Sequence, residues 1–245
     1  MIRQILKQMW NNRRSNAWIV AELILVTYFM WGVIDPVYTL LSNRAIPQGY
    51  SLHNVFSVST RGFWFYTERD RAEREMQALE QALLLIRDYP GVEAASIGNM
   101  YPLSNVHFSK NLGNQDSTNM TNTRNYMFSQ GGDFFKIFRI NDIYTGELLP
   151  STIYPEDGIY LSEDAAHRIF PHETSYVGRR VYENDTTSYT VAGIFPPLKQ
   201  ENMSGQPTPV FITVAASKLG DSFFSNSIVF RIRDDLSPTV FAAQF

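Results

Sequence analysis

The stretch AWIVAELILVTYFMWGVIDPVYTLL, residues 17–41, decides the architecture of this 245-residue chain. A helix rises about 1.5 Å per residue and the hydrocarbon core of a bilayer is about 30 Å thick, so roughly 20 apolar residues suffice to cross it. Aromatic residues stand near both ends of the stretch (Trp10, Trp18, Trp31 and Tyr38), as they do at membrane–water interfaces. The stretch is therefore predicted to be a transmembrane helix.

A cleaved signal peptide and a buried core helix are the alternatives to a membrane span. The apolar region of a signal peptide has about 7–15 residues and ends at a cleavage site of small residues. The stretch here is longer, contains bulky aromatic side chains, and is not followed by such a site. These features favour the membrane span and leave the two alternatives less favoured.

The charges that flank the stretch predict its orientation. Four basic residues and no acidic residue precede it: Arg3, Lys7, Arg13 and Arg14. Toward the other end of the stretch the first charged residue is Asp35, and the nearest basic residue is Arg44. Because cytoplasmic flanks of membrane helices are rich in Lys and Arg, residues 1–16 are expected in the cytoplasm and residues 42–245 outside it.

The cytoplasmic segment 1–16 has an apolar stripe at helical spacing, formed by Ile2, Ile5, Leu6, Met9 and Trp10. Such a segment can lie along the inner membrane surface with its basic face toward anionic lipid, although a plain charged flank is an alternative. Glu22 lies inside the apolar stretch, where a charge is costly. It is expected either to reach the headgroups near Trp18 or to contact another helix.

The composition and motifs exclude several kinds of function. The net charge of −3 shows no basic excess for nucleic acid, and the absence of cysteine excludes disulfides and thiolate metal sites. Neither a phosphate-binding G-x-x-x-x-G-K-[ST] loop nor a G-x-S-x-G nucleophile motif is present. The four histidines, His53, His107, His167 and His172, are expected at the surface because their spacing does not suit a zinc site. The sequence therefore predicts no catalytic, cofactor-binding or metal site.

Strands and helices alternate beyond the apolar stretch. Residues 55–60 and 92–97 are predicted strands, and between them lies the clearest helix, residues 67–89. Thr67 is its expected N-cap, and Pro90-Gly91 ends it. Its buried face is predicted to consist of Ala72, Met76, Leu79, Leu83 and Ile86.

The middle of the chain begins with a polar segment, residues 105–125, which is predicted to be a mobile loop because it is rich in Asn, Ser and Thr. Residues 126–140 are predicted as a strand that leads into a short helix. Residues 158–170 are predicted as a strand followed by a helix with Ser162 as N-cap. A glycine turn and a hairpin-like pair of strands are expected next, from residues 176–181 and 189–195. Late strands are expected at 209–214 and 228–233, with a last helix near Ser237.

The order of these pieces resembles the periplasmic core domain of MacB-like ABC transporter permeases, in the FtsX-like permease superfamily. The pieces that carry the resemblance are Ser129 with Asp133-Phe134-Phe135, Thr145-Gly146, and residues 159–170, 177–181 and 189–194. The resemblance covers essentially the whole chain. Two features depart from the pattern. Glu147 stands where the family has Arg, and three further membrane helices are missing, so the chain is expected to be the N-terminal part of a longer permease.

The residue pattern and the resemblance together predict an α+β fold: one N-terminal transmembrane helix followed by a two-lobed extracytoplasmic domain. Residues 51–99 and 207–245, including the strands 209–214 and 228–233, are expected to form a porter-like α/β lobe. Residues 100–206 are expected to form an inserted, mostly-β lobe. Its separate core is predicted to contain Phe134, Phe135, Ile159, Phe170, Val191 and Ile194.

The resemblance also implies a function as a permease subunit of an ABC transporter in the bacterial inner membrane. A separate cytoplasmic ATPase would drive a conformational change of the periplasmic domain, called mechanotransmission, in efflux, lipoprotein release or peptide-antibiotic resistance. The implied partners are this ATPase, a second permease chain in a homodimer or heterodimer, the lipid bilayer and a periplasmic adaptor.

Two other functions compete with a permease. A membrane-anchored ligand-binding or sensory domain would need a cytoplasmic signalling module, and the about 16 residues expected inside are too few for one. A tethered enzyme would need a catalytic motif, and the search for such motifs finds none. Both are therefore less favoured.

Overall fold

The computed structural model of the chain describes residues 13–59, 69–98, 101–102, 108–129, 132–199, 208–215 and 227–244. It divides into two units: one contains the long helix α2 (Arg13–Ala45), and the other is a folded domain that begins at Gln48. Each unit is described by itself below.

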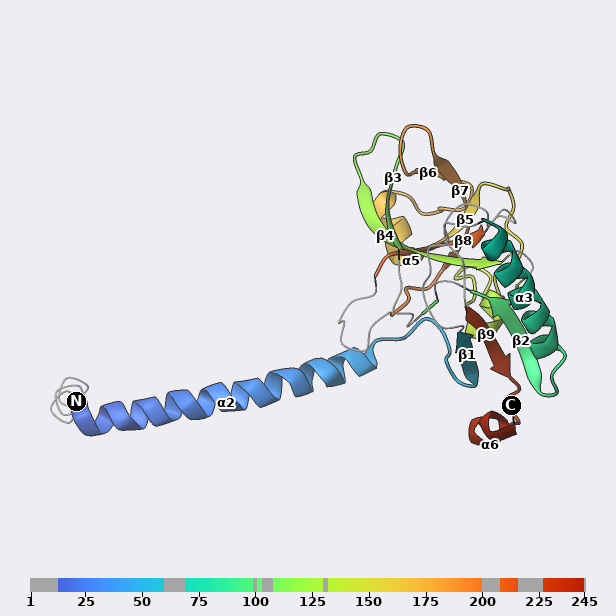
Figure 1. Cartoon of the computed structure of the whole chain (residues 1–245). Coiled ribbons are helices and arrows are strands. Elements are labelled where there is room, and N and C mark those ends of the chain that lie inside the picture. Colours follow the sequence, from blue (N-terminus) through green and yellow to red (C-terminus); the bar gives the residue numbers. More distant parts are fainter. Residues whose placement is uncertain are drawn as a thin grey trace. The chain divides into compact units, whose positions relative to one another are not determined.

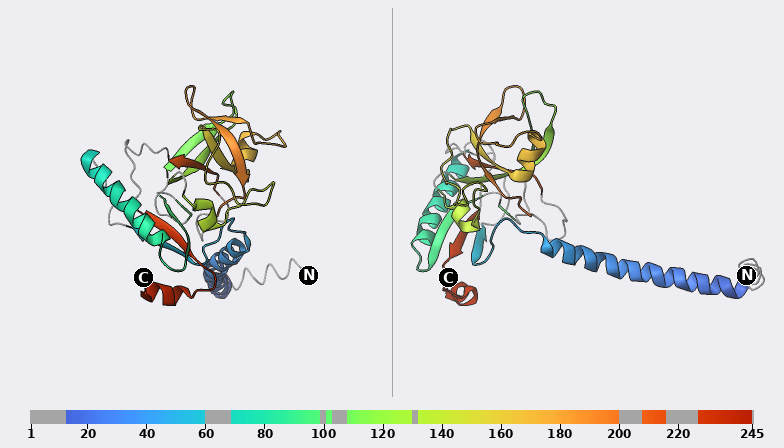
Figure 2. Two further views of the ribbon diagram at one scale, coloured as in Figure 1. Left: turned by 90° about the vertical axis from the view of Figure 1, so that its right-hand side faces the viewer. Right: turned by 180° about the vertical axis from the view of Figure 1, so that it is seen from behind.

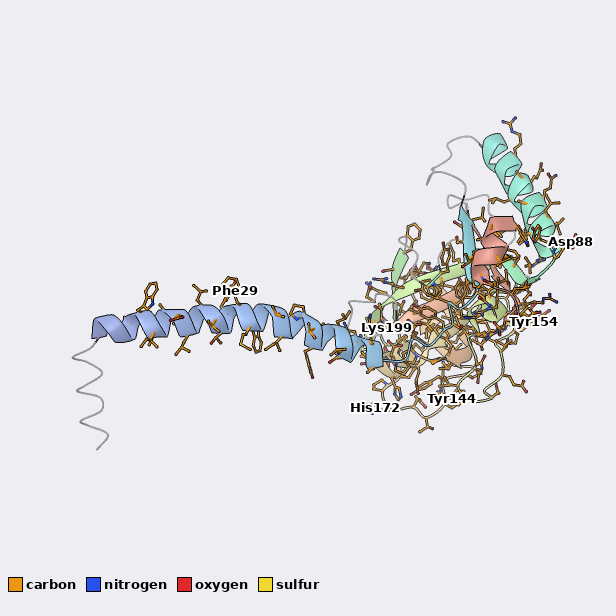
Figure 3. All side chains as sticks on the ribbon, turned by 90° about the horizontal axis from the view of Figure 1, so that it is seen from below. Phe29, Asp88, Tyr144, Tyr154, His172 and Lys199 are labelled. Atoms are coloured by element: carbon orange, nitrogen blue, oxygen red, sulfur yellow. The ribbon has the colours of Figure 1, made fainter. Side chains whose placement is uncertain are left out.

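Helix α2 is 33 residues long, and its segment Ala17–Ala45 is long and apolar enough to cross a membrane. Large apolar side chains project from opposite sides of it, as Figure 3 shows around Phe29, and residues 17–41 are all exposed. A helix that is apolar all round is typical of a membrane span. The structure therefore confirms the helix and fits a single span; the predicted stripe in residues 2–10 lies outside the described residues.

The first sheet of the folded domain has three antiparallel strands in the order β1-β9-β2. They are β1 (Val55–Ser59), β9 (Ser227–Ile232) and β2 (Val92–Ile97). Helices α3 (Arg69–Arg87) and α6 (Pro238–Gln244) accompany this sheet (Figure 1). The two predicted outer strands, the helix between them and the last helix are thus all present, while Thr67 lies outside the described residues.

Alternation along β9 directs its side chains to the two faces of the sheet. Ile228, Phe230 and Ile232 pack with the buried residues Leu79, Leu83 and Ile86 of α3, which confirms the C-terminal half of the predicted helix face. Val229 belongs instead to a cluster that contains the short helix α4 (Phe134–Phe138). The sheet therefore has helices on both faces.

The other six strands among the described residues form a closed barrel in the order β3-β4-β8-β5-β7-β6, which Figures 1 and 2 show beside the first sheet. The strands are β3 (Phe108–Gly113), β4 (Met120–Ser129), β5 (Gly158–Ser162), β6 (Arg180–Tyr182), β7 (Ser188–Phe195) and β8 (Val210–Ala215). Helix α5 (Glu163–Ile169) packs against the barrel core through Ala165, Ala166 and Ile169. A single pair, Gly113 with Tyr182, joins β3 to β6 and closes the barrel.

Two predictions about the strands of the barrel were wrong: one segment was expected to be a loop, and one strand was expected in the first sheet. The segment expected as a mobile loop, residues 105–125, contains β3 and the first half of β4, which form a hairpin. Its polar residues Thr121, Thr123 and Asn125 are buried, and the hydroxyl of Thr123 donates to the carbonyl of Lys110 at 2.8 Å. The polar composition therefore pointed to a loop, although the segment forms strands in which Thr123 and Asn125 are hydrogen-bonded.

The second error concerns β8, which was expected in the first sheet with β9. It pairs with β4 in parallel and with β5 in antiparallel fashion, so it belongs to the barrel. Its run of apolar residues shows that the strand is buried but does not say which strands flank it.

The buried apolar residues that the structure describes form three clusters in the domain, and the first sheet and the barrel share one of them. The cluster around α4 joins Ala94 and Val229 of the sheet to Tyr126, Phe128 and Tyr160 of the barrel. Phe134 and Phe135 belong to this shared cluster, whereas Ile159, Val191 and Ile194 lie in the barrel cluster with Phe170 packed against it. The expectation of one separate core for the inserted lobe was therefore wrong.

Candidate functional site

The chain between α2 and β1, residues 48–54, is called the junction here, because it is the first part of the folded domain after the apolar helix. Three separate parts of the domain hold it. The amide of Lys199 donates to Gln48 O at 3.0 Å, the amide of Ser51 donates to Phe138 O at 2.8 Å, and the amide of Ile232 donates to Asn54 O at 3.0 Å. The junction is therefore fixed to the segment after β7, to α4 and to β9.

Gly49 and Tyr50 bring the junction into close contact with the segment after β7. Gly49 has a φ of +74°, and a Cβ atom there would lie 2.3 Å from the carbonyl oxygen of Pro197. Only glycine fits both this left-handed conformation and this approach. The hydroxyl of Tyr50 donates to Lys199 O at 2.7 Å, and burial raises the pKa of Tyr50 to about 12. It therefore remains a neutral donor at physiological pH.

Arg231 on β9 holds the junction from the inside of the domain. Its side chain is fully buried, and its three hydrogen bonds all go to main-chain carbonyls. Nε donates to Ile137 O at 2.6 Å, Nη1 to His53 O at 2.6 Å and Nη2 to Ser51 O at 2.9 Å. Removing a charge from water carries a large penalty unless polar groups surround it. Burial lowers the pKa of Arg231, with the nearby charge of Arg139 as a second cause.

An exposed charged cluster lies beside this buried attachment. Arg139, in the left-handed conformation just after α4, forms a short ion pair with Asp234, and His53 Nδ1 lies 3.7 Å from the same carboxylate. The hydrogen bond from Arg139 holds the pKa of Asp234 below its usual range. Residues 53 and 234 belong to the two ends of the folded domain, so both ends meet at the end of α4.

Hydrogen bonds attach the junction to the rest of the folded domain. Among the described residues, no group of three or more His, Asp or Glu is placed to hold a metal ion. His53, His167 and His172 are exposed, as predicted, and His167 hydrogen-bonds to Tyr176 at 3.0 Å; His107 lies outside the described residues. An open hollow of roughly 400 Å³ lies between α6 and the turn after α3, lined by Tyr89, Leu236 and Phe241 among others.

Sequence reasoning missed the junction and Arg231. The junction sequence QGYSLHN contains no motif, because its attachments come from residues distant along the chain. One signal was present. Arg231 interrupts the otherwise apolar strand run IVFRI, and a charge in a buried strand requires partners.

A model of the MacB-like periplasmic core domain family matches residues 23–245, so this chain belongs to that family. The predicted resemblance is thereby confirmed. The fold class is confirmed as well, since one N-terminal apolar helix precedes a mixed α/β domain with two sheets. Domains of this family are components of ABC transporter permeases.

Solved structures with a similar fold include the periplasmic region of MacB from Actinobacillus actinomycetemcomitans, with 15% identity and a TM-score of 0.49 over 80% of this chain and 82% of that one. A domain of a putative permease protein from Porphyromonas gingivalis has 17% identity and a TM-score of 0.43 over 63% and 62%. The extracellular domain of the noncanonic ABC-type transporter YknZ from Gram-positive bacteria has 9% identity and a TM-score of 0.45 over 76% and 88%. A comparison with curated protein sequences gives no match.

Proposed function

We propose that the chain is a permease subunit of an ABC transporter, in which a separate cytoplasmic ATPase drives a conformational change of the folded domain. Family membership supports a transporter role. The observation that carries the coupling is the junction, whose residues are bonded to β9, α4 and the segment after β7. A displacement of the chain at this point is passed to the domain, because the junction cannot swing independently of these elements.

The proposed setting is the bacterial inner membrane, with residues 1–16 in the cytoplasm and residues 42–245 on the outer side. The basic N-terminal flank supports this orientation. ATP hydrolysis is assigned to the partner, since the chain has no phosphate-binding loop. The roles that fit are efflux, lipoprotein release and peptide-antibiotic resistance, carried out with a second permease chain and a periplasmic adaptor.

The proposal is tested by isolating the tagged chain from its native membrane in mild detergent. We expect an ATPase to copurify and the complex to hydrolyse ATP in a magnesium-dependent manner. The chain separated from that ATPase should neither hydrolyse nor bind ATP at millimolar nucleotide. A saturable, magnesium-dependent ATP isotherm of the separated chain would overturn the assignment of ATPase activity to a partner.

A further inference from the structure

We infer that Arg231 is the positioning residue that makes the junction, the first sheet and α4 move as one body. Its backbone is part of β9, and its guanidinium donates to two junction carbonyls, of Ser51 and His53, and to the carbonyl of Ile137 in α4. One planar side chain thus connects three elements that are far apart in the sequence.

Arginine is suited to this task in a way that other residues are not. Its guanidinium carries five donors in a fixed plane, so the three carbonyls that it binds must keep one relative arrangement. An apolar side chain here would remove the hydrogen bonds to three carbonyls, one of them buried and two partly buried. A lysine has one rotating ammonium group and does not impose a planar arrangement.

The connection continues from α4 into the barrel. Phe134 of α4 stacks on Phe128 of β4 with ring centroids 5.3 Å apart, and Phe135 meets Tyr160 of β5 edge-on at 5.0 Å. Close-packed cores transmit displacement because they compress little. A movement of the junction therefore reaches β9 through the backbone of Arg231, and the barrel through Ile137 and the phenylalanines that surround it.

The use of this connection in transport rests on the proposed function, but the connection itself can be measured without ATP. The first experiment follows amide hydrogen exchange of the wild-type full chain in lipid nanodiscs at increasing denaturant. The amide of Ser51, bonded to Phe138 O, is compared with those of Ile137 and Ile140, which are bonded within and just after α4. We expect their protection to agree within about tenfold and to respond alike to denaturant, because they open as one unit.

The second experiment uses the absence of cysteine, which allows spin labels without removal of native residues. Labels replace the exposed side chains of His53 in the junction and Asn122 on β4, and double electron–electron resonance measures their distance. The background chain and the control Arg233→Met should give one narrow distance. In Arg231→Met, the distribution of distances between the two labels should be broad. Arg233 is a matched control, since it follows β9 directly and its exposed side chain pairs only with Asp235 among the described residues.

The inference is overturned if Arg231→Met keeps the narrow distance while retaining a cooperative thermal transition. It is also overturned if the Ser51 amide of the wild type exchanges through an opening of its own that leaves Ile137 and Ile140 protected. If Arg231→Met does not fold, the wild-type exchange result decides. Failure of an ATPase to copurify would contradict the proposed function and leave these two measurements unaffected.

Discussion

Glycine at position 49 lets the junction lie close to the segment after β7. The conformation alone, with φ at +74°, disfavours any residue with a side chain. The short distance to the Pro197 carbonyl adds a steric conflict with backbone, which cannot rotate away as a side chain can. Position 49 therefore requires glycine for two independent reasons, the positive φ and the short distance to the Pro197 carbonyl. The two reasons can be separated experimentally.

Gly49→Ala should destabilise the folded domain more than Gly178→Ala does. Gly178 has a similar φ of +83°, but a Cβ atom there meets nothing within 4 Å. The unfavourable φ should cost about 1–3 kcal/mol at either position. The steric conflict adds to this at Gly49 alone. Urea unfolding of both variants measures the difference, and equal losses would show that the junction adjusts to a methyl group without strain.

The elements differ in how far the sequence could predict them. Helix α3 was predictable because its signals are local: an apolar stripe that includes Leu79 and Leu83, and a stop at Pro90-Gly91. Strand β8 was misplaced because its partners are chosen by long-range pairing, such as that of Ile212 with both Tyr126 and Tyr160.

Ser162 shows at a single position that local sequence signals do not predict long-range partners. It stands at the N-cap position of α5 as predicted, but its hydroxyl makes no capping hydrogen bond. The hydroxyl accepts instead from the amide of Val210 on β8 at 2.9 Å. The local signal gave the correct helix start, whereas the partner of the side chain depended on a strand 48 residues away.

The seam of the barrel is an element-scale feature whose stability should depend on pH. Besides the single pair that joins β3 to β6, Lys110 Nζ donates to Glu183 Oε2 at 2.7 Å, and the hydroxyl of Tyr189 donates to the same oxygen at 2.8 Å. Burial acts to raise the pKa of Glu183, but these two hydrogen bonds outweigh it, so that the pKa lies below the 4.5 that is usual for a glutamate. The unfolded chain therefore binds this proton more readily than the folded chain does.

Glu183→Gln should reduce stability near neutral pH by roughly 0.5–1 kcal/mol, as expected for a partly exposed ion pair. Stability from Glu183 is present above pH 4.5 and is lost as the pH falls through the lower folded-state pKa, so the deficit of the variant should shrink toward pH 3. Thermal unfolding from about pH 3 to pH 7 measures this convergence. The control is Glu173→Gln, which removes a more exposed pair with Arg179 away from the seam. A deficit that is independent of pH would contradict the ionic role of Glu183.

At the scale of the whole molecule, the proposed orientation in the membrane rests on the basic residues that precede the apolar stretch. An enzyme reporter that is active only outside the cytoplasm should be active when fused after Arg233 and inactive when fused before Ala17. The physical reason is the retention of Lys- and Arg-rich flanks on the cytoplasmic side. An inactive fusion after Arg233, in a stably expressed protein, would reverse the proposed orientation.

The division of the folded domain into an inserted lobe, residues 100–206, and a lobe made of the flanking residues stays a prediction, except that β8 from the flanking residues lies in the barrel. The shared cluster around α4 argues that the two parts depend on each other, because Phe135 packs among residues from both. A separate barrel cluster contains Ile194, which offers a matched site, since none of the described residues in that cluster comes from the first sheet. Substitutions at these two buried positions therefore probe the shared and the separate core.

Phe135→Ala should cost about 3–5 kcal/mol and Ile194→Ala about 2–5 kcal/mol, the usual range for emptied core positions. The two substitutions should cost similar free energy of unfolding but should reduce protection in different parts of the domain. In amide hydrogen exchange, Phe135→Ala should reduce protection in β2 and β9 as well as in β4 and β5, because the cavity opens into a core that sheet and barrel share. Ile194→Ala should reduce protection mainly in β5, β7 and α5. If Phe135→Ala left β2, β9 and α3 fully protected, the two lobes would unfold independently despite the shared cluster, and α4 would belong energetically to the barrel alone.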